Sequence, residues 1–273
     1  MDLTWDLYNP TSRANRILVV APSLGGNCSH QWAKVAELLT NDAQVVFVDY
    51  PGHALSEVWN DADEPTLDVV ASAIMDVIHE VRERTGELPV IFAGLSIGGA
   101  TGLHLARDHA DELAGVAVLC SAATVGEPDR WIERAEQVEA AGTQQLVEET
   151  SKRWFTPAFK AANPRVTTTI MEGLAAADDH SYAQLCRCLA HHDLRADLAD
   201  IRCPLLLVAG ERDSSTPIAG QELVAETVPG AQLSVIPEAS HQVTVAAPDT
   251  TANLLRAFMD RVARQARKEL PDD

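Results

Sequence analysis

Residues 90–109 read VIFAGLSIGGATGLHLARDH, and the organisation of the chain follows from this segment. Its first four residues form a short apolar run, which is typical of a strand buried on both faces of a parallel sheet. A helical pattern begins at Gly98 and continues to His109. Between the two lies Gly-X-Ser-X-Gly, whose small residues let strand and helix approach closely. The segment therefore predicts a strand–turn–helix unit that holds Ser96 in a strained turn.

The same alternation of short apolar runs and helical patterns extends to both sides of this segment. Further strands are predicted at residues 17–21, 45–48, 116–120, 205–209 and 232–236. Further helices are predicted at residues 31–39, 66–84, 218–227 and 250–268. Strands and helices that alternate in this way are typical of an α/β fold, in which a mainly parallel sheet is flanked by helices.

The segment from residue 124 to residue 200 interrupts this alternation. It contains no strand-like run, and Gly142, Pro157 and Pro164 separate its short helical patterns. These patterns cover residues 129–140, 143–154, 165–176 and 180–190. We therefore predict a core formed by residues 1–123 and 201–273, with residues 124–200 inserted as a helical cap.

Composition narrows the class of partner. The 273 residues include 40 Asp and Glu against 21 Lys and Arg, which gives a formal net charge of −19. Such a charge repels nucleic acids and anionic membranes, so we expect a small-molecule partner and leave the oligomeric state open. The chain has no apolar run of membrane-spanning length and no secretory signal pattern, and its five scattered cysteines are typical of free thiols. We expect a cytoplasmic protein.

A serine hydroxyl is a weak nucleophile unless a neighbouring base removes its proton. His241 follows the last predicted strand, and Asp213 follows the strand before it. Serine, acid and histidine in this order are typical of hydrolases that carry the serine on a strand–turn–helix unit. Asp213 could instead cap the following helix, although the three hydroxyl residues after it could fill that role. His241 could be an exposed loop histidine.

Acyl transfer also needs N–H groups that stabilise the negative oxygen of the intermediate. The N–H of Ile97, directly after the serine, is one expected donor. The other is expected in the loop PSLGG, residues 22–26, where we assign the N–H of Leu24. An ordinary glycine turn is the alternative interpretation of that loop.

Other reactive side chains favour structural roles. His53 lies in a turn and His104 within a helix, so neither is the expected base. Cys186 and Cys188 are two residues apart on a predicted helix and would point to different faces, which disfavours a shared metal. The chain has no phosphate-binding loop and no dinucleotide fingerprint. We expect neither a metal nor a cofactor.

At these residues the chain resembles the α/β-hydrolase superfamily and, within it, the 3-oxoadipate enol-lactonases. The segments around Ser96, Asp213 and His241 are common to the superfamily. The more specific similarities are SLGGNCSHQW and RWFTPAF, together with the longer segments 121–142 and 181–213. The chain departs from the family at residues 51–54, which read PGHA rather than Arg-Gly-His-Gly, and in its short N-terminal segment.

The resemblance implies an α/β-hydrolase fold and hydrolysis of 3-oxoadipate enol-lactone to 3-oxoadipate, a step of aromatic catabolism in the β-ketoadipate pathway. A cation must then bind the substrate carboxylate. Trp131 and Arg134 are three residues apart and share a helix face. Arg153 beside Trp154 is the rival pair, and Arg134 could instead be a surface residue paired with a neighbouring glutamate.

Two other functions use the same scaffold. A general carboxylesterase or a carbon–carbon bond hydrolase would need the same three residues. A small-ligand receptor that retains the triad would bind its ligand much faster than it turns it over.

Overall fold

The computed structural model describes residues 1–10 and 12–269. Its seven strands form one sheet in the order β1-β3-β2-β4-β5-β6-β7, and all neighbours are parallel except β1 and β3. The strands are β1 (Thr4–Leu7), β2 (Ile17–Ala21), β3 (Gln44–Asp49), β4 (Val90–Leu95), β5 (Gly115–Leu119), β6 (Leu205–Gly210) and β7 (Gln232–Ile236). The predicted fold class is confirmed.

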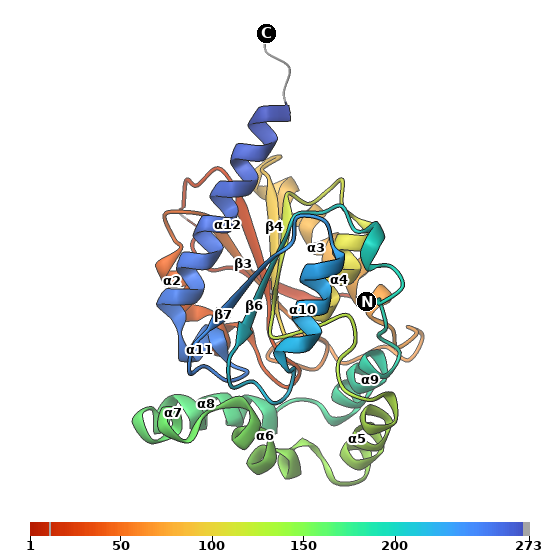
Figure 1. The fold of residues 1–273 in the computed structure, drawn as a ribbon. Coiled ribbons are helices and arrows are strands. Elements are labelled where there is room, and N and C mark those ends of the chain that lie inside the picture. Colours follow the sequence, from red (N-terminus) through yellow and green to blue (C-terminus); the bar gives the residue numbers. More distant parts are fainter. Residues whose placement is uncertain (11, 270–273) are drawn as a thin grey trace.

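Helices cover both faces of the sheet (Figure 1). Because side chains alternate along a strand, Ile17 and Val19 of β2 pack into one apolar cluster, and Leu18 and Val20 into the other. The first cluster includes residues of α3 (Leu67–Thr85), α4 (Ile97–Asp108) and α10 (Ile218–Thr227). The second includes residues of α2 (Ala33–Leu38), α11 (Val243–Ala246) and α12 (Pro248–Glu269).

A layer of short helices lies across one end of the sheet (Figure 1). It consists of α5 (Pro128–Ala141), a 3₁₀ turn (Thr143–Leu146), α6 (Val147–Trp154), α7 (Pro157–Ala162), α8 (Pro164–Ala175) and α9 (Asp179–Ala190). The chain enters and leaves this layer side by side, because the N–H of Leu194 donates to the carbonyl of Ala123 at 2.9 Å. The division of the chain into a core and a cap at residues 124–200 stays a prediction.

Three local features differ from the expected elements. The helix expected at 31–39 is divided at the buried Trp32 into α1 (Cys28–Gln31) and α2, and the indole N–H of Trp32 donates to the carbonyl of Ala21 at 3.0 Å. Strand β1 was not expected, since this edge strand buries little and lacks an apolar run. Helices α7 and α11 are only 6 and 4 residues long and were also missed.

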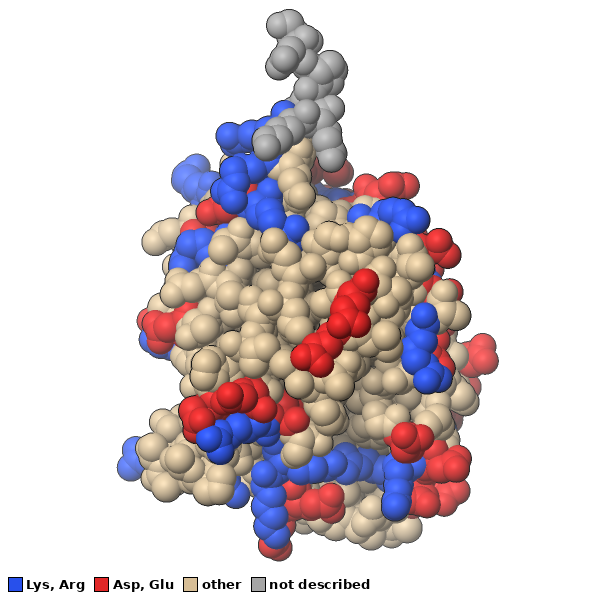
Figure 2. Space-filling model, in the orientation of Figure 1, with Lys and Arg blue, Asp and Glu red and all other residues tan. Residues whose placement is uncertain are grey.

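Charge is unevenly distributed over the surface. Figure 2 shows basic side chains gathered at the end of α12 farthest from the cap layer, where Arg267 lies in the last turn and complements the negative end of the helix dipole. No helix in the described part of the chain is long and apolar enough to cross a membrane.

Candidate active site

Ser96 occupies the sharp turn between β4 and α4. Its backbone has φ 61° and ψ −116°, which is costly for any residue other than glycine. The flanking glycines are required by space, because a Cβ on Gly94 would lie 2.0 Å from the carbonyl of Gly98, and one on Gly98 would lie 2.9 Å from the carbonyl oxygen of Ala21. The turn exposes Ser96 partially, whereas Leu95 and Ile97 are buried.

Asp213 and His241 form a buried hydrogen-bonded pair. Asp213 follows β6 and His241 follows β7, and Nδ1 of the histidine lies 2.8 Å from Oδ2 of the carboxylate. The same carboxylate accepts hydrogen bonds from the N–H groups of Ser215 and Thr216 at 2.8 and 3.1 Å, and from the Thr216 hydroxyl at 2.6 Å. Helix α10 has Pro217 as its N-cap, so Asp213 does not cap it.

The surroundings favour the ionised acid. Burial by itself would raise the pKa of Asp213, but the His241 ring and the hydrogen bonds from His241 and Thr216 hold that pKa below its usual value. An ionised Asp213 accepts the proton on Nδ1 of His241, which leaves Nε2 of the ring as the atom that can take a proton from a nucleophile.

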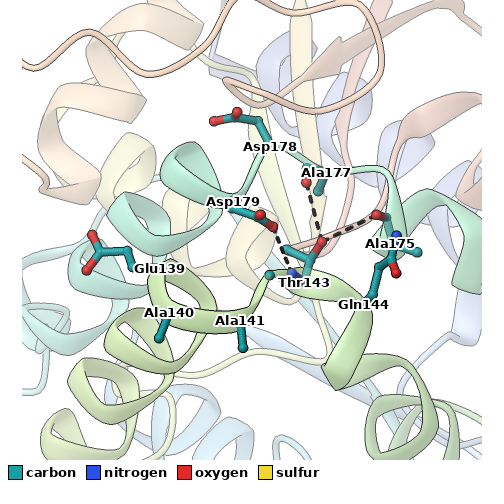
Figure 3. A pocket seen from close by; sticks show the side chains of 10 residues that line it. Glu139, Ala140, Ala141, Thr143, Gln144, Ala175, Ala177, Asp178 and Asp179 are labelled. Atoms are coloured by element: carbon teal, nitrogen blue, oxygen red, sulfur yellow. Dashed lines mark hydrogen bonds between the residues drawn. The ribbon is translucent and has the colours of Figure 1, made fainter.

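Ser96 and His241 line one small cavity of about 50 Å³ between the sheet and the cap layer. The cavity is lined by Leu24, Ser96, Val125, Trp131, Arg134, Thr150, Arg153, Trp154, Tyr182, Ser215, Thr216 and His241. Leu24 and all four cap residues expected from the sequence are therefore close to the nucleophile and the base. A larger hollow of about 540 Å³, between α5 and α9, shares none of these lining residues (Figure 3).

The loop that carries Leu24 is held rigidly. The Ser23 N–H donates to Oε1 of Gln31 at 2.9 Å, and the Ser23 hydroxyl accepts from Nε2 of Gln31 at 2.7 Å and of Gln242 at 3.1 Å. The Gly26 N–H donates to the carbonyl of Ser23 at 2.8 Å, which closes a tight turn. The N–H groups of Leu24 and Ile97 donate to no described residue and are free to bind a developing oxyanion.

The cap side of the cavity carries aromatic and cationic groups. The Arg134 guanidinium lies 5.3 Å from the centre of the Trp131 ring, a favourable cation–π distance. Glu133 pairs with Arg130 at 3.2 Å, so it is not the partner of Arg134. The Trp154 ring stacks on His241 with centroids 6.2 Å apart. Among the described residues that line this cavity there is no Asp or Glu.

Three polar atoms of the lining residues have no hydrogen-bond partner among the described residues: Oγ1 of Thr150, Nε of Arg153 and Oγ of Ser215. Burial, and then the neighbouring Arg134, lower the pKa of Arg153. Sequence reasoning missed Thr150, although it lies three residues before Arg153 on α6 and shares its face. It also missed Tyr182, Ser215 and Thr216 as lining residues.

Helix α6 is bonded directly to the histidine loop. The Ser240 hydroxyl donates to the carbonyl of Arg153 at 2.7 Å, and the N–H of Gln242 donates to the carbonyl of Trp154 at 3.3 Å. The residues on both sides of His241 are therefore attached to the C-terminus of one cap helix.

The two histidines expected to be structural are buried away from the cavity lining. Nδ1 of His53 lies 2.8 Å from the carbonyl oxygen of Pro51, and Nε2 accepts a hydrogen bond from the N–H of Gly25 at 2.9 Å. His104 contacts Asp68 at 2.8 Å and His192 at 3.0 Å. Both positions fit the structural interpretation.

Metal-ligating atoms meet at one place in the described residues, where Cys120, Asp213 and His241 lie within 4.8 Å of one another. Burial, and then the negative Asp213, raise the pKa of Cys120 well above its usual value. Without a bound cation, this thiol holds its proton. Asp213 and His241 of this cluster are hydrogen-bonded to each other, which fits acid–base chemistry. Cys186 and Cys188 are both buried in α9.

Comparison with known proteins follows the same direction. A family model described as "Alpha/beta hydrolase family" matches residues 18–254. The chain is 31% identical to 3-oxoadipate enol-lactonase 1 of Acinetobacter baylyi, covering 90% of this chain and 89% of that protein. It is 28% identical to a pimeloyl-[acyl-carrier protein] methyl ester esterase of Chromobacterium violaceum, covering 77% and 81%.

A solved structure is similar over nearly the whole chain. The crystal structure of the enol-lactonase from Burkholderia xenovorans LB400 superposes with a TM-score of 0.87 at 27% identity, covering 94% of this chain and 96% of that one.

Proposed function

Since the chain belongs to the alpha/beta hydrolase family and is a hydrolase of ester bonds, we propose that it opens a small carboxylated enol-lactone, converting 3-oxoadipate enol-lactone to 3-oxoadipate. The observation that supports a serine mechanism best is the buried Asp213–His241 pair, whose ring lines the same cavity as Ser96. Fold alone would not distinguish this reaction from others on the same scaffold.

The reaction would begin with attack of the Ser96 hydroxyl oxygen on the lactone carbonyl carbon, while Nε2 of His241 accepts the hydroxyl proton. Asp213 would stabilise the imidazolium through Nδ1. The N–H groups of Leu24 and Ile97 would bind the oxyanion of the tetrahedral intermediate. Its collapse breaks the ring C–O bond, and the enol oxygen that leaves stays attached to the acyl chain and takes the proton from His241.

Water completes the cycle. With its proton accepted by His241, water attacks the ester carbonyl on Ser96, and the second collapse returns the proton to the serine oxygen. The product acid releases its proton to solvent and leaves as a carboxylate, and its enol tautomerises to the ketone. One water is consumed, and the residues return to their starting protonation states. The reaction needs neither a metal nor a cofactor.

Arginine would supply the recognition of the substrate carboxylate. The net charge of −19 opposes the approach of an anion, so a local cation is required. Arg134 and Arg153 both line the cavity, which supports a carboxylate site there. The planar guanidinium pairs with a carboxylate through two parallel hydrogen bonds. We propose Arg134 as the main anchor, with Trp131 covering the lactone ring, and Arg153 beside Trp154 as the alternative.

The test is steady-state turnover of 3-oxoadipate enol-lactone beside neutral p-nitrophenyl esters. Arg134→Ala should lower kcat/KM on the lactone by about ten- to a hundredfold, because a hydrogen bond to a charged group contributes about 1.5–3 kcal/mol. The neutral ester should change far less. Equal losses on both substrates, or none, would exclude Arg134 as the anchor and make Arg153→Ala the next variant. Failure of the wild type to open the lactone would reject the substrate.

A carboxylesterase acting on a carboxylated ester is the second candidate. The similarity to a methyl ester esterase favours it, since that relative also covers most of the chain. The same cavity and the same arginine would bind such an ester. A higher kcat/KM for methyl esters than for the enol-lactone would therefore favour the carboxylesterase function.

A further inference from the structure

His53 connects two loops at the cavity although it does not line the cavity itself. The side chain is buried, with 1% of its surface exposed. Its ring spans from the carbonyl of Pro51, 2.8 Å from Nδ1, to the N–H of Gly25, 2.9 Å from Nε2. Gly25 directly follows Leu24, whose N–H is the proposed oxyanion donor.

These two contacts fix the protonation of the ring. A carbonyl oxygen only accepts, so Nδ1 must carry a proton. A backbone N–H only donates, so Nε2 must be unprotonated. One state satisfies both contacts, namely the neutral imidazole with its hydrogen on Nδ1. Burial lowers the pKa of His53, although the contact with Pro51 and the charge of Asp178 act in the opposite direction.

The accepted N–H belongs to the central peptide of a turn. Residues 23–26 form a turn closed by the Gly26 N–H and the Ser23 carbonyl, and Gly25 has φ +81°. That φ is characteristic of the third position of a type II turn, in which the central peptide can rotate to give a type I turn. Nε2 of His53 accepts from this central peptide and therefore selects one of the two turn types.

We infer that His53 is a positioning residue for the oxyanion loop, holding the Leu24–Gly25 peptide through its unprotonated Nε2. A protonated ring would place two donors against each other, and the peptide would have to rotate to bring the Leu24 carbonyl to Nε2. The inference rests on the proposed function, because it assigns the Leu24 N–H to the oxyanion.

The groups around the ring are compatible with this role. Tyr182 stacks on it with ring centroids 6.4 Å apart, and Tyr50 meets it edge-on at 6.5 Å. Asp178 is the charged group that acts on it. The loop that contains Gly25 is also confined by the cap layer, because a Cβ at Gly25 would lie 2.3 Å from Cδ1 of Leu174.

A pair of variants separates positioning from packing. His53→Gln keeps an acceptor within reach of Gly25 but cannot titrate, whereas His53→Phe keeps the ring volume and removes the acceptor. His104→Phe serves as a matched control, since it also removes a buried, hydrogen-bonded histidine but lies outside the loop. Each is assayed on a neutral p-nitrophenyl ester and for inhibition by phenylboronic acid, whose adduct with a serine is tetrahedral.

The Phe variant should lose about thirtyfold in kcat and about the same factor in boronate affinity, with KM within about threefold, because only the transition state uses the oxyanion donors. The Gln variant and the His104→Phe control should stay within about threefold of the wild type. As the pH falls below the ordinary histidine pKa of about 6.5, the Gln variant should lose activity less steeply than the wild type, because its side chain cannot titrate. Equal losses in both His53 variants, or a loss confined to KM, would overturn the inference.

Hydrogen exchange of the Gly25 amide provides a readout without turnover. Protection should be kept in the wild type and the Gln variant and lost in the Phe variant. This result separates the inference from the proposed function, since a protein inactive on every ester would still show the protection. If the Phe variant does not fold, the Gln variant decides alone, and a folded Gln variant that loses more than about thirtyfold in kcat refutes the inference.

Discussion

The cavity has two sides that differ in how far their polar groups are already satisfied. On the sheet side, Asp213 accepts four hydrogen bonds, and the loop around Leu24 is fixed by Gln31 and Gln242. On the cap side, the Thr150 hydroxyl and Nε of Arg153 make no hydrogen bond to a described residue, and Nε lies 3.8 Å from Oε1 of Glu149. Unmade hydrogen bonds at buried groups are costly, so they mark where a ligand is expected to bind.

This difference indicates that the sheet side carries out catalysis and the cap side binds the substrate. The sheet side is preorganised for chemistry and needs no substrate to assemble it. The cap side retains polar atoms that a polar ligand would bind. Ser215 is the exception, because its hydroxyl lies on the sheet side and also lacks a partner. Substitutions on the sheet side should therefore alter the rate for every ester, and those on the cap side should alter the preference among esters.

The largest effect is expected at the nucleophile. Ser96→Ala should lower kcat on any ester by about a millionfold, since the residues of a triad act as a unit. The fold should persist, because alanine fits the same turn, and circular dichroism with thermal melting checks this. A folded variant with near-native activity would show that Ser96 is not the nucleophile, and the sheet side of the cavity would then not be the catalytic side.

The next effect is at the acid. Asp213→Asn should lower kcat by about ten-thousandfold with little change in structure, because the amide would hold the imidazole in the wrong tautomer. The loss should be equal for the lactone and the neutral ester. A loss of less than about tenfold in steady-state kinetics would mean that another carboxylate orients His241.

The pH dependence should also be common to all substrates. The general base must be unprotonated, so kcat/KM should fall as the pH is lowered. The pKa of Asp213 is held below its usual value, so this carboxylate stays ionised from about pH 5 to 8. A profile of kcat/KM that is flat from about pH 5 to 8 is incompatible with a histidine base.

The smallest effect is expected on the cap side, at Thr150. Thr150→Val removes the unpartnered hydroxyl without changing the volume and should raise KM for the carboxylated lactone by about tenfold, if that hydroxyl binds the carboxylate. Thr150→Ser retains the hydroxyl and is the matched control. Both variants should leave the neutral ester nearly unchanged. An equal rise in KM for the two substrates would assign Thr150 to packing alone.

Local patterns were enough to predict the elements that carry the chemistry. Gly94 and Gly98 indicate the tight turn at Ser96, and the positions of Asp213 and His241 after successive strands place them at one edge of a parallel sheet. The fold class that follows is confirmed by the topology. The roles of the three residues stay predictions until the variants are measured.

Contacts between distant segments could not be predicted in this way. The bond from His53 to Gly25 joins residues 28 positions apart, and nothing in either local sequence indicates it. The unpartnered state of Thr150 depends on everything packed around it. The cap residues were expected partly from the resemblance and partly from the spacing of Trp131 and Arg134, and that spacing reports a shared face without indicating what the face meets.

The attachment of α6 to the histidine loop has a consequence for engineering. Cap segments are natural units to exchange when a new specificity is wanted. Here the carbonyls of Arg153 and Trp154 hold the residues on both sides of His241, so a transplanted cap that shifts the end of α6 by one residue would displace the general base. A chimera that replaces α5 but keeps residues 147–155 would change the substrate-binding surface and leave the base attached. In such a chimera, the junction between the exchanged and the retained cap segments should therefore lie before α6.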